Sequence, residues 1–575
     1  MNYRRCFLEK DKQYKTSILS EDIAKLGNTV NGWKITVVGF SVGNKNEKYT
    51  MNYRVFIPTA GKGSRLGHRT AHLNKALLKV GNKAVISHTI DAFPKDIQFV
   101  IALGYQGDLV RQYLEITYPE RNFIFVEIDK LEGLGSGPGY SLFCCKKELQ
   151  CPFYFVSCDT IIDWKNRLHC LFDWAGWSEI DEHEIKDYCT ISVKDPDHCG
   201  DWEVSGFHNK SEKGTTNAFT GVACINSYQE FWKKMTLEQS SIKEIEVAPA
   251  ILSISNICAW WVDWYDTGSE TGLRQARECF QGLQNLDKAD EEIYFINGNT
   301  IKYFRDEDIV KDRLHRVRQL KDVIPKILQS TKNFYKYEFL KGKDLFDIDN
   351  QCEIMGSLLK FYKQDLWKDV QLSEIDKIAF KRVCLNFYQS KTILRLKKFF
   401  ENCNVIDRED IINETNVPKI EDIFKIIDWN WLCDGIPSVF HGDLHFSNTL
   451  LLNDGTFKLL DWRQNFGDLI NYGDRYYDLA KFYHQFLCPH ISIKSKQFSI
   501  IEKDGLIKTQ IEISENIKKA KNIYECWIVD EGYDLKKVKI LTGIIFLNMS
   551  PLHENPLDRY LFYFAKKNLY DTLNV

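Results

Sequence analysis

The stretch Pro58-Thr59-Ala60-Gly61-Lys62-Gly63-Ser64-Arg65-Leu66-Gly67 is a glycine-rich turn between two ordered patterns. It follows the apolar run Val55-Phe56-Ile57 and precedes Asn74-Lys75-Ala76-Leu77-Leu78. Glycine lets the backbone approach a ligand closely and aim its N–H groups at a phosphate. Arg65 and Lys75 supply positive charge that can neutralise a transferred phosphoryl group. The stretch therefore predicts a strand followed by a phosphate-binding turn.

Beyond this turn, short apolar runs alternate with longer helical patterns. The runs Phe99–Leu103 and Phe123–Val126 enclose a helical pattern near Asp108–Tyr118, and another helix is expected after Lys75. Such βαβα alternation is typical of a mostly parallel sheet covered by helices. The fold expected from residue 51 onward is therefore α/β and Rossmann-like.

Three later segments place polar groups where such a sheet binds ligands, at the carboxyl ends of its strands. Glu132–Leu142 is a second glycine-rich loop, and Asp159 follows the buried run Phe153–Val156. Asp266 lies in the third segment, Trp264–Thr271. The first and the last of these segments could also be purely structural. Glu132–Leu142 could be a surface turn, and Trp264–Thr271 could hold a pair of residues that cap a helix.

Together the four segments resemble the signature of the sugar-phosphate nucleotidyltransferases. Two residues depart from that signature, because Thr59 stands in place of an alanine and Asn74 in place of a proline. The resemblance implies an N-terminal nucleotidyltransferase domain in which a phosphate oxygen of an acceptor attacks the α-phosphorus of a nucleotide and pyrophosphate leaves. Positioning and charge neutralisation carry such a transfer.

The resemblance also assigns residues. Arg65 and Lys75 are the expected catalytic cations, and Asp159 and Asp266 are the expected Mg²⁺ ligands. The expected nucleotide-binding residues are Ala60, Gly61, Gly63, Ser64, Gly135, Ser136 and Gly137.

A second set of motifs lies in the last third of the chain. Val439-Phe440-His441-Gly442-Asp443-Leu444-His445-Phe446-Ser447-Asn448 is followed by Thr456-Phe457-Lys458-Leu459-Leu460-Asp461-Trp462-Arg463. An Asp that can accept a hydroxyl proton, an Asn five residues on and an Asp ending a strand are the base and Mg²⁺ ligands of kinase chemistry. The motif resembles the aminoglycoside and choline kinase-like phosphotransferases.

By this second resemblance Asp443 is the base, Asn448 and Asp461 are the metal ligands, and His441 packs the loop. Asp478 is expected to be a structural acid that caps a helix.

The same resemblance extends upstream. Lys302 stands on the second strand of a hairpin predicted by the turn Asn297-Gly298-Asn299, and it is expected to bind the nucleotide phosphates. Its acidic partner is expected on the helix that holds Asp308 and Asp312. A glycine-rich loop covering the phosphates is absent from the sequence here, which is typical of small-molecule kinases. The expected C-terminal fold is a bilobal, kinase-like α+β domain.

Bulk composition agrees with a packed protein that acts on small molecules. Of 575 residues, 44% are hydrophobic and 27% charged, and 76 Lys and Arg balance 79 acidic residues. This balance predicts no nucleic acid partner. The 17 cysteines show no zinc spacing, and no signal peptide or membrane-spanning run is present in the sequence, so free thiols and a cytoplasmic location are expected. Whether the chain forms a homo-oligomer stays open.

A composition shift near residues 280–290 predicts the domain organisation. The expected parts are an N-terminal segment 1–50 of unknown role, with one apolar run at Ile35–Phe40, a nucleotidyltransferase domain 51–284 and a small-molecule kinase domain 285–575.

A kinase makes a phosphomonoester and a nucleotidyltransferase consumes one. The pairing implies that an alcohol, sugar or polyol is phosphorylated with ATP and then converted to a nucleotide-activated precursor for capsule or envelope glycans. CTP is favoured because cytidylyltransferases for phosphocholine and polyol phosphates share this glycine turn and kinase companion.

Two alternatives stay open at this point. One is a choline kinase joined to a phosphocholine cytidylyltransferase, which Arg463 disfavours because choline kinases commonly have an acid at that place. The other is a nucleotidyltransferase whose kinase-like half only binds or oligomerises.

Overall fold

The computed structural model describes residues 53–164, 172–194, 202–210, 213–235, 247–252, 254–283, 290–348, 350–403, 405–503 and 505–574, and the backbone of two short strands before them. Those strands, β1 (Thr29–Val30) and β2 (Trp33–Lys34), pair antiparallel within the unit Met1–Asn52. The run Ile35–Phe40 lies outside the described residues. All other described elements belong to a second unit, Tyr53–Val575.

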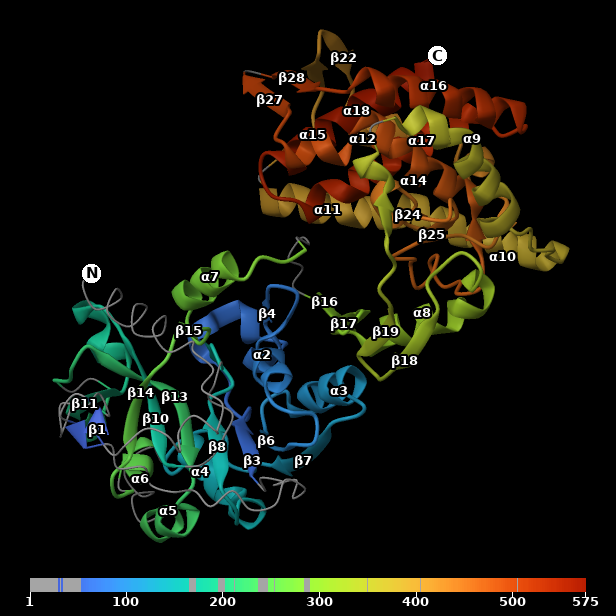
Figure 1. The fold of residues 1–575 in the computed structure, drawn as a ribbon. Coiled ribbons are helices and arrows are strands. Elements are labelled where there is room, and N and C mark those ends of the chain that lie inside the picture. The colour runs from blue at the N-terminus through green and yellow to red at the C-terminus, as the bar shows by residue number, and fades with distance from the viewer. Residues whose placement is uncertain are drawn as a thin grey trace. The chain divides into compact units, whose positions relative to one another are not determined.

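A nine-stranded sheet is the centre of the region 53–283 (Figure 1). Four neighbouring strands, in the order β8-β3-β6-β7, run parallel to one another. Their bounds are Phe153–Val156, Arg54–Pro58, Gln98–Leu103 and Asn122–Glu127. This block is the parallel sheet that the βαβα pattern predicts, and the predicted α/β fold is confirmed.

The other half of the sheet is mixed. β13 pairs antiparallel with β8 and with β10 and β11, whereas β10 and β14 are parallel. The strands of this half are β10 (Trp174–Glu179), β11 (Thr190–Lys194), β12 (Glu203–His208), β13 (Asn217–Ile225) and β14 (Cys258–Trp261).

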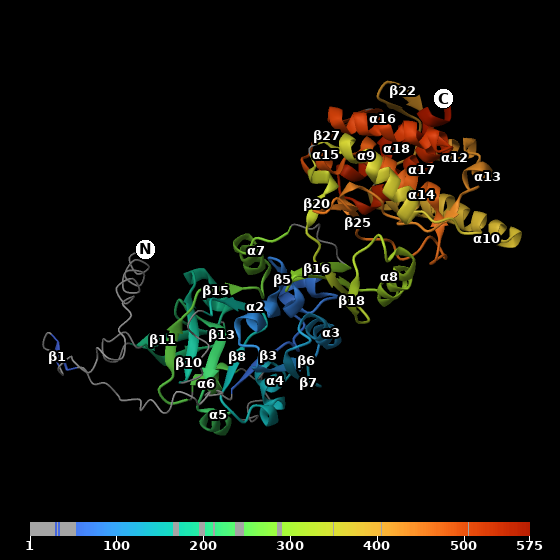
Figure 2. The same ribbon diagram turned by 45° about the vertical axis from the view of Figure 1, so that its right-hand side comes forward.

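Helices cover both faces of the parallel block, because its central strands β3 and β6 bury consecutive residues rather than alternate ones. On one face Phe56, Val100 and Phe155 join one core with residues of α4 (Pro138–Cys144), α5 (Tyr228–Lys234) and α6 (Ala248–Leu252). Figures 1 and 2 show α2 (Val85–Ala92) and α3 (Gly107–Thr117) across the sheet from these helices.

A small two-stranded sheet sits at the carboxyl end of the parallel block. β9 (Thr160–Ile162) pairs with β15 (Trp264–Asp266), with Thr160 opposite Asp266. This pairing carries Asp266 to the end of β8, where Asp159 is. The helix α7 (Glu270–Cys279) follows directly.

The predicted hairpin is present. β16 (Glu291–Ile296) and β17 (Asn299–Phe304) are joined by Asn297 and Gly298, both with positive φ, 52° and 71°. Such a pair of angles matches the right-handed twist of the two strands. The hairpin continues into a four-stranded sheet with β19 (Phe334–Glu338) and β18 (Ile327–Ser330), and α8 (Glu307–Leu320) lies between β17 and β18 in the chain.

The rest of the chain is chiefly helical (Figure 1). Its helices pack around one large apolar core. The sheet β20-β24-β25, with strands Gly342–Asp344, Thr449–Leu452 and Phe457–Leu459, carries the second motif. This sheet and the helices form the second lobe of the predicted α+β domain. The helices are α9 (Gln351–Phe361), α10 (Glu374–Leu385), α11 (Lys391–Cys403), α12 (Ile420–Ile426), α13 (Trp429–Leu432), α14 (Arg475–Leu487), α15 (His490–Lys494), α16 (Glu515–Asp530), α17 (Leu535–Met549) and α18 (Leu557–Asn574).

The four-stranded sheet is in contact with α3 of the preceding region. The rings of Tyr113 and Tyr294 meet at a centroid distance of 4.9 Å, and both side chains are fully buried. Lys336 on β19 donates to the carbonyl of Ile116 at 2.6 Å. Through these contacts the four-stranded sheet packs against α3.

None of the described helices is both long enough and apolar enough to cross a membrane.

Candidate active sites

The glycine turn leaves β3 at the carboxyl edge of the sheet and is held there by the two residues that depart from the family signature. Thr59 is buried, and its hydroxyl donates to the carbonyl of Ala102 on β6 at 2.8 Å. Asn74 donates from its amide to the carbonyls of Thr59, at 2.8 Å, and Tyr105, at 2.6 Å. Thr59 and Asn74 therefore act together to hold the turn in place. Within the turn, Gly63 has a positive φ of 67°.

A cleft of about 380 Å³ opens over this turn. The residues predicted from the first resemblance gather around it, except Gly135, which is buried in the adjoining loop with a φ of 74°. The predicted residues that line the cleft are Ala60, Gly61, Gly63, Ser64, Arg65, Lys75, Ser136, Gly137, Asp159 and Asp266.

Lys75 and Asp159 form the ion pair at the floor of the cleft, with an Nζ–Oδ2 distance of 2.7 Å. Ser157 donates to the other oxygen of Asp159 at 2.5 Å. Burial alone would lower the pKa of Lys75 and raise that of Asp159, but the attraction between the two outweighs it. The pKa of Lys75 is therefore raised and that of Asp159 lowered, so both stay charged at neutral pH.

Asp266 lies beside this pair and is half-buried. Tyr188 donates to its Oδ2 at 2.9 Å and the backbone of Gly268 donates to Oδ1 at 2.9 Å. Burial, and then the charge of Asp159, raise the pKa of Asp266. Two carboxylates that repel each other in this way are a place where a cation is stabilised.

Gly268 shows how closely the charged groups converge. A methyl group at this position would lie 2.7 Å from Asp159 Oδ2, 3.1 Å from Arg65 Nη2 and 3.1 Å from Asp266 Oδ1. Only a residue without a side chain leaves that space open. The hard carboxylate oxygens of Asp159 and Asp266 suit Mg²⁺, which usually takes one or two carboxylates and completes its shell with water and phosphate. The described residues contain no cluster of three or more His, Cys, Asp and Glu.

Sequence reasoning missed Tyr188, which has no motif around it and enters the cleft from the loop before β11. For Trp264–Thr271 the sequence predicts a metal ligand, Asp266, and a pair of residues that cap the following helix. Ser269 does cap α7, accepting from Gly272 N at 3.1 Å, but Glu270 pairs with Arg69 at 3.0 Å instead of closing the cap.

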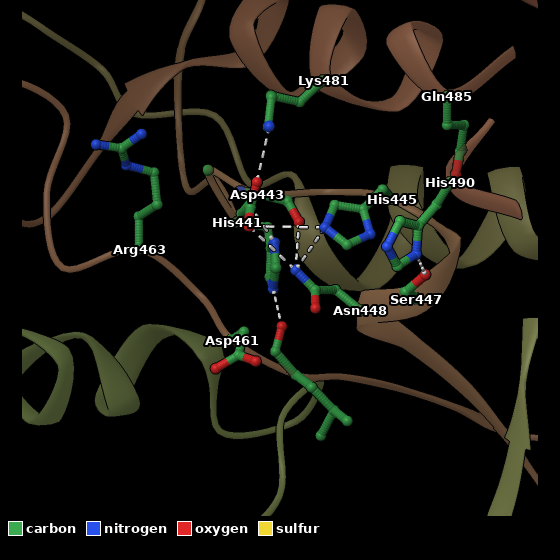
Figure 3. A network of polar contacts seen from close by, with 12 residues as sticks. His441, Asp443, His445, Ser447, Asn448, Asp461, Arg463, Lys481, Gln485 and His490 are labelled. Carbon is green, nitrogen blue, oxygen red and sulfur yellow. Dashed lines mark hydrogen bonds and ion pairs between the residues drawn. The ribbon is translucent and has the colours of Figure 1, made fainter. Parts of the chain in front are cut away.

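The second motif forms a loop between β23 (Pro437–Ser438) and β24, shown in Figure 3. His441 is fully buried, and its Nε2 lies 2.8 Å from the carbonyl of Leu460 while its Nδ1 accepts from the backbone of Asp443 at 3.2 Å. Burial lowers the pKa of His441 to about 3, so the ring is neutral. It therefore joins the loop to β25 rather than carrying charge.

Asp443 keeps part of its side chain accessible and lies 2.8 Å from Lys481 on α14. Burial would raise the pKa of Asp443, but Lys481 holds it well below its ordinary value. Asn448 donates to the carbonyl of Asp443 at 2.9 Å, and its side-chain oxygen points to the side of the loop where Asp461 lies (Figure 3). An amide oxygen and a carboxylate there also suit Mg²⁺.

Helix α14 holds the loop through three residues that sequence reasoning did not connect. Asp478 accepts from the backbone N–H groups of His441 and Gly442, each at 2.6 Å. Lys481 pairs with Asp443, and Gln485 accepts from Phe446 N at 2.6 Å. The spacing of three and four residues puts all three on one helix face, which is the signal that could have revealed them.

Asp478 is therefore structural, as expected, but the expectation that it caps a helix is wrong. Asp474 is the N-cap of α14, accepting from Tyr476 N at 3.0 Å, and Asp478 is one turn inside the helix. Its carboxylate is fully buried and serves the loop.

Lys302 is buried on β17 and pairs directly with Asp461, which has a positive φ of 58°. Of the two acids expected as its partner on α8, Asp308 is exposed and lies 4.0 Å from Lys311. Instead α8 presents Arg313, which donates to Asp461 at 3.4 Å and to the hydroxyl of Tyr335 at 3.1 Å. The carboxylate of Asp461 thus lies between two cations.

Comparisons with known proteins found solved structures similar to the N-terminal region and a family model that matches part of the C-terminal region. Three solved structures similar to the N-terminal region are a glucose-1-phosphate thymidylyltransferase from Bacillus anthracis, the CTP:phosphocholine cytidylyltransferase of Streptococcus pneumoniae and an inositol-1-phosphate CTP transferase from T. maritima. Identities are 17%, 19% and 16%, and TM-scores are 0.33, 0.32 and 0.32. They cover 41%, 40% and 40% of this chain and 98%, 99% and 95% of their own chains.

A comparison with curated protein sequences gave no match. The sequence model of the phosphotransferase enzyme family, APH, matches residues 302–493. This range begins at Lys302 and contains Asp443, Asn448 and Asp461, so the C-terminal part of the chain carries a domain of the phosphotransferase enzyme family.

Proposed function

We propose that the chain is a bifunctional enzyme, in which a kinase domain, 285–575, phosphorylates a small alcohol and a nucleotidyltransferase domain, 51–284, activates the product. The observation that carries this proposal is that charged side chains gather in two separate places, each beside a loop with a phosphate-chemistry motif. One pairs Lys75 with Asp159 beside a glycine turn, and the other joins Lys302 and Asp461 beside Asp443.

In the nucleotidyltransferase half, Ala60, Gly61, Gly63 and Ser64 direct backbone N–H groups at the nucleotide phosphates. Arg65 and Lys75 offset the negative charge that develops as an oxygen of the acceptor phosphate attacks the α-phosphorus. The bond from that phosphorus to the bridging oxygen breaks, and pyrophosphate leaves. Asp159 and Asp266 would hold Mg²⁺, which supplies further charge neutralisation of the phosphates.

In the kinase half, Lys302 neutralises the phosphates of ATP and Asp443 orients the acceptor hydroxyl and takes its proton. Lys481 keeps Asp443 ionised at neutral pH, so that the carboxylate is ready to accept. Asn448 and Asp461 would hold Mg²⁺ at the transferred phosphoryl group.

CTP is the favoured nucleotide on the sequence resemblance alone, and the product is a cytidine diphosphate derivative that serves as a precursor of capsule or envelope glycans in the cytoplasm. The alternative of a non-catalytic kinase-like half is disfavoured because the charged residues that the chemistry needs are present and in contact. Choline as the acceptor is disfavoured by the positive charges around Asp443.

Pyrophosphate release with each nucleoside triphosphate, and ADP release with a panel of alcohols, test the proposal. Asp159→Ala and Asp266→Ala should each slow nucleotidyl transfer by about 10²-fold or more, since a charge-stabilising contact in the transition state is worth that much. Near-normal transfer in either variant would remove that residue from the site. No ADP with any alcohol would refute the kinase half.

A further inference from the structure

Four cationic side chains gather beside the Asp443 loop. Lys481 reaches Asp443 from α14, and Arg463 follows the second motif with its Cβ packed against Gly442, where a methyl group would lie 2.8 Å away. Figure 3 shows that Arg463 and Asp461 point to opposite sides of the loop, although only one residue separates them. The remaining two, Lys391 and Arg395, come from α11.

These cations are positioned by aromatic and neutral groups. The Nζ of Lys391 lies 4.0 Å from the ring centre of Phe387, and the guanidinium carbon of Arg463 lies 5.6 Å from the same ring. Arg463 also donates to the hydroxyl of Tyr477 at 3.3 Å, and Arg395 donates to the carbonyl of Asn548 at 2.9 Å. Contacts with a ring or a hydroxyl group fix the orientation of these side chains, but they do not neutralise the positive charges.

Few carboxylates lie near these four cations. Among the described residues, no carboxylate lies within ion-pair distance of Lys391, Arg395 or Arg463, and the carboxylate of Asp443 pairs with Lys481. The Nε of Arg463 is buried without a hydrogen-bond partner in the described part of the chain. A buried donor left unpaired is costly, and this adds to the cost of holding the cations together.

Mutual repulsion is already visible in Lys391. Burial, and then the charges of Arg463, Arg395 and Lys481, lower its pKa to about 7. Holding several half-buried cations together is unfavourable unless an anion enters among them. The set is placed beside the catalytic loop, on the side away from Lys302 and Asp461, where an acceptor rather than ATP would approach.

We propose that the acceptor of the phosphotransferase site is an anionic alcohol, a hydroxyl compound that also carries a carboxylate or phosphate group. This inference rests on the proposed kinase function and names its substrate class. Arg463, Lys391 and Arg395 bind the anion, and the free hydroxyl meets Asp443. The hydroxyl oxygen attacks the γ-phosphorus of ATP, the bond from that phosphorus to the bridging oxygen breaks, ADP leaves, and the hydroxyl proton passes to Asp443.

The same charges argue against a cationic acceptor. A quaternary ammonium would enter a site with an excess of positive charge, and the ring of Phe387, which could serve such a ligand, is already covered by Lys391. Choline and amino sugars are therefore disfavoured.

Matched acceptors test the inference. Each neutral alcohol is compared with its carboxylate and phosphate forms: glycerol with glycerate and glycerol 3-phosphate, and glucose with glucuronate and glucose 6-phosphate, with choline as the cationic case. The kcat/KM measured by ADP release should be at least about 10-fold higher for an anionic form than for the neutral alcohol. The free energy of a hydrogen bond to a charged group corresponds to about a 10-fold change in affinity. The two anionic arms distinguish carboxylate from phosphate.

Variants then show which residues bind the anion. Arg463→Gln and Lys391→Met should each raise KM for the anionic acceptor by about 10- to 100-fold while KM for ATP changes less than about 2-fold. Lys398→Met, an exposed lysine on the same helix, should change neither. A preference for neutral alcohols or choline, or a rise in KM for ATP instead, would overturn the inference.

A binding measurement needs no turnover. Citrate and inorganic phosphate, compared with chloride at equal ionic strength, should raise the thermal unfolding midpoint of the full chain more than that of Arg463→Gln. Equal shifts in the two proteins would contradict anion binding by Arg463. ADP release with a neutral preference refutes only the substrate class, whereas no ADP with any alcohol refutes the kinase function and this inference together.

Discussion

The ammonium of Lys75 and the carboxylate of Asp159, 84 residues apart in the chain, form a partly buried ion pair with an Nζ–Oδ2 distance of 2.7 Å. The pair ties the glycine turn to the strand end where Asp266 also lies. Each partner keeps the other charged in a cleft that would otherwise favour their neutral forms.

Lys75→Met keeps the length of the side chain and removes its charge. We expect nucleotidyl transfer to fall by about 10²-fold or more, since the charge acts on the transition state, while the kinase activity stays near that of the unchanged protein. Pyrophosphate and ADP release measure the two activities, and the unfolding midpoint reports any loss of stability. Lys95→Met, at an exposed position, is the matched control. Equal loss of both activities would indicate unfolding instead of a catalytic role.

Gly268→Ala tests the convergence of charges more finely. The added methyl group would lie 2.7 Å from Asp159 Oδ2 and 3.1 Å from Arg65 Nη2, so these groups must move apart. Nucleotidyl transfer should drop by about 10²-fold, since small misplacements of catalytic groups have effects of that size. Gly206→Ala in β12, where the new methyl group would be 3.5 Å from Ser192 Cβ, should be tolerated. Unchanged nucleotidyl transfer by Gly268→Ala would mean that the carboxylates of Asp159 and Asp266 do not act together in the reaction.

The two activities should be separable. Asp443→Ala removes the proposed base, so ATP-dependent phosphorylation should fall below detection, while nucleotidyl transfer to a pre-phosphorylated acceptor continues. Asp454→Ala, in the exposed turn between β24 and β25, is the control. If a folded Asp443→Ala protein loses both activities, the two-site proposal is wrong.

Much of this arrangement could be predicted from the sequence because its signals are local. The glycine turn, the acids after apolar runs and the Asn297-Gly298 hairpin depend on neighbouring residues, and all appear in the structure. The predicted α/β and kinase-like folds followed from the alternation of runs and from the second motif.

Other features depend on contacts between distant segments. Nothing near Arg313 in the sequence indicates that it meets Asp461, the residue that pairs with Lys302. The face of α14 that carries Asp478, Lys481 and Gln485 has a helical spacing, but the spacing does not say what the face touches. The contacts of Tyr188 with Asp266 and of the cations around Phe387 likewise could be seen only in the structure.

The titration of Lys391 should make KM for the anionic acceptor depend on pH. Its pKa of about 7 in the acceptor-free protein means that it is protonated below this pH and neutral above it, with Arg463, Arg395 and Lys481 as the charges that face it. An anionic acceptor binds the protonated form better, so KM for that acceptor should rise as pH increases above about 7, by up to about tenfold per pH unit.

Initial rates of ADP release from pH 6 to 9 measure this dependence. Lys391→Arg, which stays charged across the range, should flatten the rise in KM while KM for ATP follows the same course in both proteins. The same steep rise in the variant would assign the titration to another group.

The last prediction concerns the order of the two reactions. If both sites serve one pathway, each must recognise the same carbon skeleton, whereas the phosphate itself is bound by general charges such as Arg65 and Lys75. The alcohol that the kinase phosphorylates best should therefore, once phosphorylated, be the best nucleotidyl acceptor. A mixture of candidate alcohols with ATP, Mg²⁺ and CTP should yield one dominant cytidine diphosphate product. That product should disappear without ATP and return when the phosphomonoester is supplied. A preferred phosphomonoester that the kinase half cannot make would mean that the two sites act on different molecules.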